Sequence, residues 1–280
     1  LSDPLFAELD LTRQDLREAV ERVPMVAEAL QLLYARFQAG GSGQPDAAAM
    51  RGTLLGRPTE ADALLDALED RHNHFPQLET AAEALSNDAG LRQSHLEADL
   101  SRHLAEAHGH VVRTMPASVM ETAAFRHDLH GKRLIFNELA PPESRVFALG
   151  LTVAELSLRD EMLALVEAMG IRQPSSATMM LSALKGYFAA AVMMPYVPFL
   201  TAAKQLRYDI DLLSRRFGVS FEQACHRLTT LNAPANKGIP FAFIRIDDAG
   251  NVSKRISAGG INFSLHGGTC PKWSVHRSFR

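Results

Sequence analysis

The chain has 280 residues, a net charge of −3 and 46% hydrophobic residues, which is enough apolar content for one large core or for two domains. Its longest apolar candidate, residues 187–200, is interrupted by Pro195 and Pro198, so we expect no membrane-spanning segment. Two cysteines, Cys225 and Cys270, cannot form a disulfide framework or, by themselves, a tetrahedral metal site. These features predict a folded cytoplasmic protein without a membrane partner.

The small net charge conceals a gradient along the chain. Residues 1–110 carry 9 basic and 19 acidic side chains, a net of −10, whereas residues 201–280 carry 12 basic and 5 acidic ones, a net of +7. A basic C-terminal surface suits an anionic partner, such as ligand phosphates or an acidic region, and a solvated surface explains it equally well. The chain begins with Leu1 rather than Met and has no signal-like segment, so we expect it to be part of a longer protein.

The first third of the chain has helical periodicity. In residues 11–38 apolar side chains recur at every third or fourth position, which predicts one long amphipathic helix. The segments 59–70, 77–86 and 91–107 again show apolar stripes beside acidic faces. Residues 1–108 are therefore predicted to form a helical bundle that connects to the neighbouring domain.

The pattern changes near residue 110. Residues 111–113 begin a β-rich region that continues through residues 122–128 and 132–138, with residues 129–131 as a turn. This region predicts short strands or a hairpin. Helices return at residues 144–168, in a segment that lacks internal prolines.

A second long helix is predicted at residues 177–193, and residues 207–228 then form two short helices joined by a turn. In that pair Gly218 ends the first helix, and Ser220 with Gln223 forms a capping box at the start of the second. Acidic residues interrupt its basic ones, so we do not expect this helix-turn-helix outline to read DNA.

The last region resembles a β-hairpin. Residues 239–246 and 252–256 are β-branched and aromatic runs on either side of the turn sequence at 247–250. The fold class that follows is α+β and mainly helical. We divide it into a helical bundle and connector at 1–108, an α+β domain at 109–235 and the start of a β domain at 236–280.

Common catalytic motifs are missing from the sequence. It contains no phosphate loop, no dinucleotide fingerprint and no hydrolase elbow. Two HxH spacings occur, at His72 with His74 and at His108 with His110, and histidines at surface turns explain them better than a metal does. The zinc-peptidase motif HExxH is also missing.

Four segments carry a family resemblance: RYDIDLLSRRFGVSFEQACHRL at 207–228, GIPFAFIRID at 238–247, GNVSKR at 250–255 and GGTCPKW at 267–273. They resemble the short-chain fatty-acyl transcriptional regulators, such as the actinobacterial regulators of propionate (methylcitrate) and glyoxylate metabolism. The resemblance implies an Xre-type helix-turn-helix, an ImmA/IrrE-like domain and a C-terminal domain peculiar to the family. The opening residues of this chain look like the segment that follows the DNA-binding part.

The ImmA/IrrE resemblance also locates a degenerate metal site. The phrase FALGLTVAE at 147–155 resembles the zinc-helix phrase FTLAHELGH, so Leu151 and Glu155 stand at the two histidine positions. In LKGYFAAAVMMP, at 184–195, Leu184 stands where the third ligand, a glutamate, is expected. The resemblance therefore implies a peptidase scaffold that has lost its metal.

Two leucines in place of metal ligands turn a polar cleft into an apolar one, in which each buried methylene of a ligand contributes about 0.8 kcal/mol. We predict that four apolar side chains line a pocket for a short acyl chain: Phe136, Leu151, Leu184 and Phe188. Four polar side chains are candidates for the phosphate and amide groups of coenzyme A: Arg133, Arg145, Lys185 and Tyr187. Alternatively, the leucines simply fill the core.

A second place for the phosphates stays open. It comprises the segment 196–208 and the basic hairpin with Arg245, Lys254 and Arg255, because helix or strand ends beside guanidinium groups bind anions readily. The family also implies a cysteine cluster able to hold an iron-sulfur centre further toward the C-terminus. We expect Cys270 to be a structural thiol and any such centre to lie beyond these residues.

The function that the resemblance implies is the ligand-sensing and oligomerisation region of a transcription regulator. It binds short-chain acyl-CoA, most plausibly propionyl-CoA, as a dimer or tetramer without catalysis. Occupancy controls promoter DNA binding by a helix-turn-helix domain absent from these residues. Two alternatives remain: a zinc peptidase that cleaves a repressor, and a purely structural dimerisation module.

Overall fold

The computed structural model of the chain describes residues 60–246 and 252–257, and these belong to a compact unit that spans Pro58–Arg280. The predicted helix at 11–38 and the GGTCPKW segment at 267–273 lie outside the described residues. The described part is mainly helical with a small three-stranded sheet and a separate β-hairpin, which confirms the α+β class.

Three helices in the first part match the periodicity of the sequence. They are α4 (Glu60–Asp70), α5 (Pro76–Asp88) and α6 (Leu96–His108), with a short 3-10 turn, η2 (Gln93–His95), before α6. Pro76 occupies the first turn of α5, where its missing N–H costs nothing. Gly109 ends α6 with a left-handed φ of 69°.

A mixed sheet follows α6. Its strands are β1 (Val111–Met115), β2 (Phe125–Asp128) and β3 (Arg133–Asn137), with the single turn α7 (Ala117–Met120) after β1. The order is β1-β3-β2: β2 and β3 form the predicted antiparallel hairpin, and β1 pairs parallel to β3. The parallel pairing is a tertiary feature that local patterns did not predict.

Two helices occupy the segment for which one was predicted, so that prediction was wrong. α8 (Pro142–Ser157) ends before Leu158, whose φ of −125° and ψ of 13° are not helical, and α9 (Arg159–Ala168) starts directly after it. Leu158 packs against the core, so tertiary packing rather than proline or glycine breaks the helix. The next helices are α10 (Pro174–Met193) and α11 (Tyr196–Gln205).

The short helix pair forms as its sequence predicts. α12 (Ile210–Phe217) and α13 (Phe221–Leu228) are separated by Gly218 in the left-handed region, with a φ of 62°. The Ser220 hydroxyl accepts a 3.1 Å bond from the Gln223 N–H, and the Gln223 side chain accepts a 2.8 Å bond from the Ser220 N–H. The capping box is therefore confirmed.

The second predicted hairpin is also present. β4 (Ala242–Ile246) and β5 (Val252–Ser257) pair antiparallel, with a register irregularity next to Ile246. Among the described residues no single helix is long and apolar enough to span a membrane. By length and composition alone, α10 and α11 pass that test as a pair bent by 66°.

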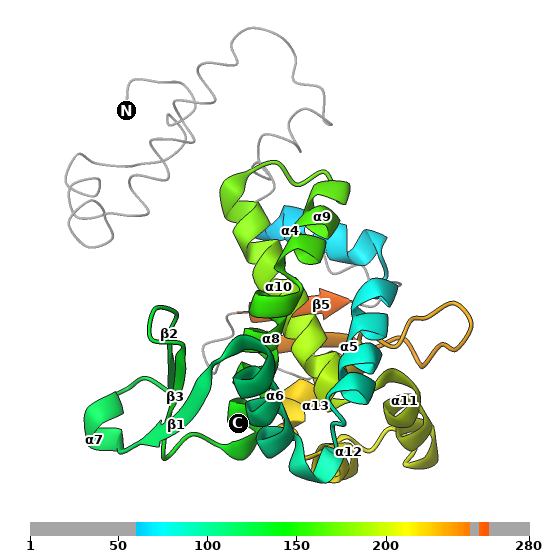
Figure 1. The fold of residues 1–280 in the computed structure, drawn as a ribbon. Coiled ribbons are helices and arrows are strands. Elements are labelled where there is room, and N and C mark those ends of the chain that lie inside the picture. The colour runs from blue at the N-terminus through cyan, green and yellow to red at the C-terminus, as the bar shows by residue number, and fades with distance from the viewer. Residues whose placement is uncertain (1–59, 247–251, 258–280) are drawn as a thin grey trace, which may run out of the picture. The chain divides into compact units, whose positions relative to one another are not determined.

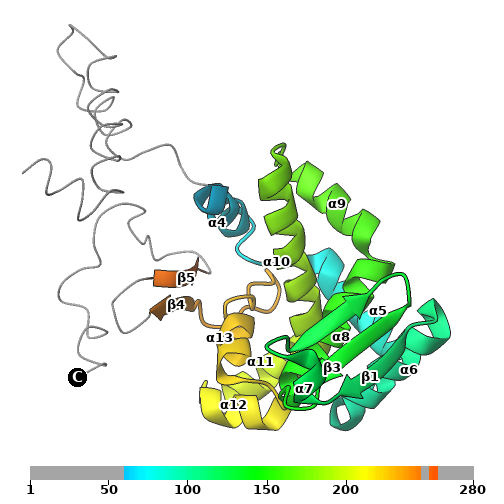
Figure 2. The same ribbon diagram turned by 90° about the vertical axis from the view of Figure 1, so that its left-hand side faces the viewer.

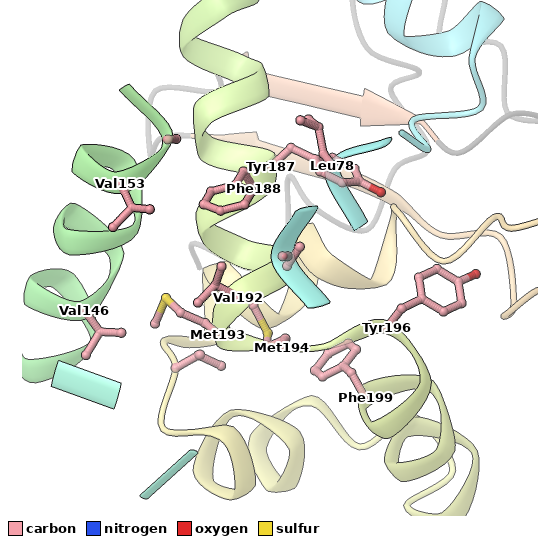
Figure 3. Packing of buried hydrophobic residues seen from close by; sticks show 14 of the residues in the cluster. Leu78, Val146, Val153, Tyr187, Phe188, Val192, Met193, Met194, Tyr196 and Phe199 are labelled. Carbon is pink, nitrogen blue, oxygen red and sulfur yellow. The ribbon is translucent and has the colours of Figure 1, made fainter. Parts of the chain in front are cut away.

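Helix α10 is the centre of the core. It contacts α8, α5, α4 and α9, and Figure 1 shows it running between α8 and α5. Figure 3 shows Val146 and Val153 on the side of α8 that faces Phe188 and Val192 of α10. The sheet adds Leu134 and the other inward side chains of β3 to the same core.

Glycine permits the close approach of α8 and α10. A Cβ atom at Gly150 would lie 2.9 Å from the Cβ and 3.0 Å from the Cα of Ala189, which is closer than real Cβ atoms come. On α10, by contrast, a Cβ at Gly186 would meet only the Phe147 ring, at an ordinary 3.7 Å. A side chain therefore fits at Gly186 but not at Gly150.

We expect Gly150→Ala to lower the free energy of unfolding, by about 1–3 kcal/mol, because overpacking outweighs the helix propensity that alanine adds. Gly186→Ala, the matched control, is expected to leave stability unchanged or to raise it by up to about 1 kcal/mol. Urea denaturation of both variants measures the difference. Equal effects of the two substitutions would contradict the close packing of α8 on α10.

Candidate functional site

A cavity of about 520 Å³ lies between α8, α10 and α13, with β5 at its margin. Helix α10 lines it with small side chains at helical spacing: Ser182, Ala183, Gly186 and Ala190. These residues create the space, because larger side chains on this face would fill it. Phe147 and Leu151 of α8, one turn apart, form an apolar wall. The volume falls within the range of small-molecule sites.

A buried ion pair lies behind the wall of the cavity, which one of its members, Arg227, lines. The guanidinium of Arg227, on α13, donates bonds of 2.7 and 2.9 Å to the two carboxylate oxygens of Glu79, on α5. Arg227 is 1% exposed and also donates, through Nε, a 2.8 Å bond to the Met194 carbonyl. A buried pair of this kind is stable only when its remaining donors and acceptors are satisfied, and here they are.

Two tyrosines complete the network. The Tyr187 hydroxyl donates a 2.6 Å bond to Glu79, and the Tyr187 and Tyr196 rings lie 5.8 and 5.7 Å from the Arg227 guanidinium carbon. The Tyr196 hydroxyl donates to the Asn236 carbonyl and accepts from the Ala233 N–H, both at 2.9 Å. The network thus joins α5, α10 and α13 to the loop before β4.

Burial and charge shift the pKa values of this network. Burial alone would raise the pKa of Glu79, but the charge and hydrogen bonds of Arg227 outweigh it and hold that pKa below its usual range. Burial, together with the Glu79 carboxylate, raises the pKa of Tyr187. Burial lowers the pKa of His74, whose Nδ1 lies 3.3 Å from the Tyr187 hydroxyl.

The remaining wall of the cavity comes from α13 and the hairpin. Glu222, Gln223 and His226 of α13 line the cavity, and so does Ile256 of β5. Arg245 of β4 lies 3.2 Å from Glu222, and the His226 and Phe243 rings lie 4.6 Å apart. The basic hairpin is therefore next to the cavity, and Figure 2 shows β4 and β5 beside α13.

The positions that the peptidase resemblance assigns to zinc do not fit the ion. Leu151 and Leu184 offer no donor atoms. Glu155 offers a carboxylate, which pairs with Lys185 at 3.0 Å and also with Arg159. Burial raises the pKa of Glu155, but these two cations lower it by more. In the described part of the chain no group of three His, Cys, Asp or Glu side chains is arranged to hold a metal ion.

The structure brings two of the eight predicted site residues to the cavity, Leu151 and Tyr187. Three others are in the core, each at most 1% exposed: Phe136, Leu184 and Phe188. Lys185 pairs with Glu155 across α8 and α10, and Arg145 pairs with Glu97 of α6 at 3.0 Å. Arg133 is exposed on β3.

Sequence reasoning missed the residues that build the cavity. Glu79 and Arg227 are 148 positions apart, and nothing local marks them as partners. A usable signal was present on α10, where Ser182, Ala183, Gly186 and Ala190 repeat small side chains at helical spacing in an otherwise apolar helix. Such a face leaves space for a close neighbour or a ligand.

Two family descriptions match the chain. Residues 105–229 match the IrrE N-terminal-like domain, and residues 230–280 match the C-terminal domain of the short-chain fatty acyl coenzyme A regulators. The first match includes the sheet and helices α8 to α13, and the second begins in the loop before the hairpin.

The chain is also similar to named regulators. It is 36% identical over 268 residues to the HTH-type transcriptional regulator PrpR of Mycobacterium tuberculosis, which covers 94% of this chain and 55% of that protein. It is 31% identical to the propionyl-CoA carboxylase regulator of Cereibacter sphaeroides, over 100% of this chain and 59% of that protein. The chain thus spans little more than half the length of these two relatives.

A solved structure of a Mycobacterium tuberculosis transcriptional regulator shares the fold. Its TM-score is 0.74 at 38% sequence identity, over 80% of this chain and 67% of that one. At this identity the likeness extends to the sequence as well as to the fold.

Acidification is expected to destabilise the protein through Glu79. Because the pKa of Glu79 is lower in the folded than in the unfolded chain, its contribution to stability is complete above the ordinary glutamate pKa of about 4.3 and is lost as the pH falls below it. We expect Glu79→Gln to be less stable than the wild type at pH 7, by about 3–5 kcal/mol, and to lose less stability on acidification.

Melting temperatures between pH 7 and pH 3.5 measure this effect. Glu83→Gln, on the exposed side of the same helix, is the matched control and should follow the wild-type curve. Parallel curves for Glu79→Gln and the wild type would contradict the assigned role of the ion pair.

Proposed function

The chain belongs to the short-chain fatty acyl coenzyme A regulator family, and on that premise we propose that it is the ligand-sensing and oligomerisation region of a transcription regulator that binds a short-chain acyl-CoA. Propionyl-CoA is the ligand that we favour. Binding controls a helix-turn-helix that these 280 residues do not contain. The region itself performs no catalysis and acts as a dimer or tetramer.

The observation that supports this proposal best is the cavity between α8, α10 and α13. Its apolar wall of Phe147 and Leu151 suits an acyl chain, and its small α10 side chains leave room for one. Its polar lining, which includes Ser182 of α10, suits the thioester and amide groups of a coenzyme A arm. We therefore place the acyl group between α8 and α10.

We place the coenzyme A phosphates near the basic hairpin rather than near Arg133 or Arg145. Ile256 of β5 lines the cavity and Arg245 of β4 lies beside Glu222 on its wall, so an extended arm that leaves the cavity there meets the hairpin. Arg145 pairs with Glu97 of α6 and does not line the cavity. The roles first predicted for Arg133, Arg145 and Lys185 stay predictions.

Two features support this sensor over its alternatives. The peptidase alternative needs a zinc site, and the side chains at the corresponding positions do not fit the ion. The α12–α13 pair does not offer a free DNA-reading face either. Arg227 of α13 is buried against Glu79, and its neighbours on the helix line the cavity.

A thermal-shift comparison across CoA, acetyl-CoA, propionyl-CoA and zinc tests the proposal. We expect the acyl-CoA thioesters to raise the melting temperature of the chain, because a ligand that binds only the folded state stabilises it, and zinc to have no effect. Stabilisation by zinc together with chelator-sensitive proteolysis would favour the peptidase. No shift with any acyl-CoA would contradict the sensor.

We expect Ala183→Leu, which places three extra carbon atoms in the cavity, to reduce the propionyl-CoA shift at least several-fold. Ala164→Leu, the same substitution on the exposed side of α9, is the matched control and should keep the shift. If Ala183→Leu binds propionyl-CoA as the wild type does, by calorimetry, the acyl group lies elsewhere.

Charge reversal tests the place of the phosphates. We expect Lys254→Glu to weaken CoA binding about tenfold or more, because a favourable charge near the phosphates becomes a repulsive one. Arg133→Glu should leave the affinity unchanged. Titration calorimetry measures the CoA affinity of both variants. A loss of affinity in Arg133→Glu but not in Lys254→Glu would place the phosphates beside the sheet instead.

A further inference from the structure

The sheet β1-β3-β2 has two faces of different character, as the strand register shows. Ile135 at the centre of β3 pairs with Arg113 of β1 on one side and with Arg126 of β2 on the other. Cross-strand partners share a face, and so do residues two apart on one strand, so Arg133 joins them. By the same rules Val111 and Met115 of β1 and Asp128 of β2 share this face. We use the name outer face for its central set: Arg113, Arg126, Arg133 and Ile135.

The opposite face of the sheet packs against the core. Leu134 and Phe136 of β3 are at most 1% exposed and belong to the main hydrophobic cluster. The three arginines of the outer face, in contrast, are all exposed. The outer face is therefore a solvent-facing surface carried by a framework that is anchored on its other side.

The arginines of the outer face lack acidic partners. Elsewhere in the described part of the chain, six arginines form ion pairs with carboxylates: Arg92, Arg102, Arg145, Arg159, Arg227 and Arg245. Within the same residues, Arg113, Arg126 and Arg133 form none, and Arg126 donates only to the Met120 carbonyl, at 3.3 Å. Asp128, the cross-strand partner of Arg133, accepts a 2.8 Å bond from the Gly131 N–H.

This concentration of charge is unusual for the chain, which carries a net charge of −3. Neighbouring strands lie about 4.8 Å apart, so the Cα atoms of Arg113 and Arg126 are about 10 Å apart across β3. Guanidinium groups bind phosphate groups with paired hydrogen bonds, so three exposed arginines on one face suit a partner that carries several phosphates. Because arginine is also enriched in protein–protein interfaces, an acidic protein is the alternative that the experiment has to separate from DNA.

We propose that the outer face contacts the phosphodiester backbone of duplex DNA. The proposal rests on the proposed function of the chain as part of a DNA-bound regulator, and it adds a second contact to that of the helix-turn-helix. Phosphate contacts of this kind position a protein on the duplex without reading its sequence. A tethered second contact raises the overall affinity through its effective concentration.

The test is a titration of a fluorescent 25-base-pair duplex of arbitrary sequence with the 280-residue chain, at several salt concentrations from 50 to 200 mM. The variant R113Q/R126Q/R133Q removes the three charges and keeps most of each stem. The control R172Q/R215Q/R216Q removes three other exposed arginines. Circular dichroism and melting temperatures establish that both variants fold.

We expect the wild-type chain to bind the duplex weakly and with a salt dependence. Each lost phosphate contact lowers the slope of log K against log[salt] by about 0.9. The outer-face variant should therefore lose about 2 to 3 units of slope and at least tenfold in affinity at 50 mM salt, and the control should lose little. Absence of wild-type binding, or equal losses in both variants, would overturn the proposal.

Two further arms separate this surface from other partners and from the sensor function. In the first, polyglutamate and unlabelled duplex DNA each compete with the fluorescent duplex for the chain. If polyglutamate competes as well as DNA per unit of charge, the outer face binds an acidic protein, and the DNA assignment is wrong. The propionyl-CoA thermal shift of R113Q/R126Q, which leaves the ligand-binding candidate Arg133 unchanged, should equal that of the wild type. If propionyl-CoA does not shift the melting temperature of the wild type, the proposed acyl-CoA-sensing function is wrong. The duplex titration tests the outer face independently of that result.

Discussion

The buried ion pair between Glu79 and Arg227 is the interaction on which the arrangement of the described helices depends. It joins α5 to α13 across 148 residues, and Tyr187 of α10 donates a third bond to the same carboxylate. Removal of either charged partner would leave an uncompensated charge in the core, at a cost of about 3–5 kcal/mol. Because every charged group in it has a partner, the network specifies one position of α13 relative to α10, and that position leaves the cavity between them.

The same network connects the wall of the cavity to the loop before β4. Tyr196, whose ring lies beside Arg227, holds the loop before β4 through the Ala233 N–H and the Asn236 carbonyl. Under the proposed function, a ligand in contact with α8, α13 and β5 favours the arrangement of these elements that binds it better. A ligand shifts an equilibrium only by its different affinities for the two states, so the segments that contact it on both sides of the cavity are the ones able to transmit occupancy.

The sequence predicted the elements whose signals are local, and the structure explains why it missed the others. The capping box of Ser220 and Gln223 and the left-handed Gly218 require only a few neighbouring residues, so the helix pair could be predicted closely. The break at Leu158 and the parallel pairing of β1 with β3 depend on packing between distant segments, which no local pattern contains. The same limit applies to the site. Leu151 could be placed from a motif, but a partnership such as that of Glu79 with Arg227 exists only in three dimensions.

Side chains at and near the metal positions of the peptidase pattern hold α8 and α10 together in this chain. In the peptidase pattern, ligands from the two helices that correspond to α8 and α10 hold one ion, which also ties the helices together. Here Glu155 of α8 pairs with Lys185 of α10, and Gly150 lets the two backbones approach closely at Ala189. With the helices held in this way, Leu151 no longer has a ligand's role and is free to line the cavity. Under the proposed function, the scaffold therefore holds an apolar binding site where the peptidase pattern holds an ion, and side-chain packing and the Glu155–Lys185 pair keep its central helices together.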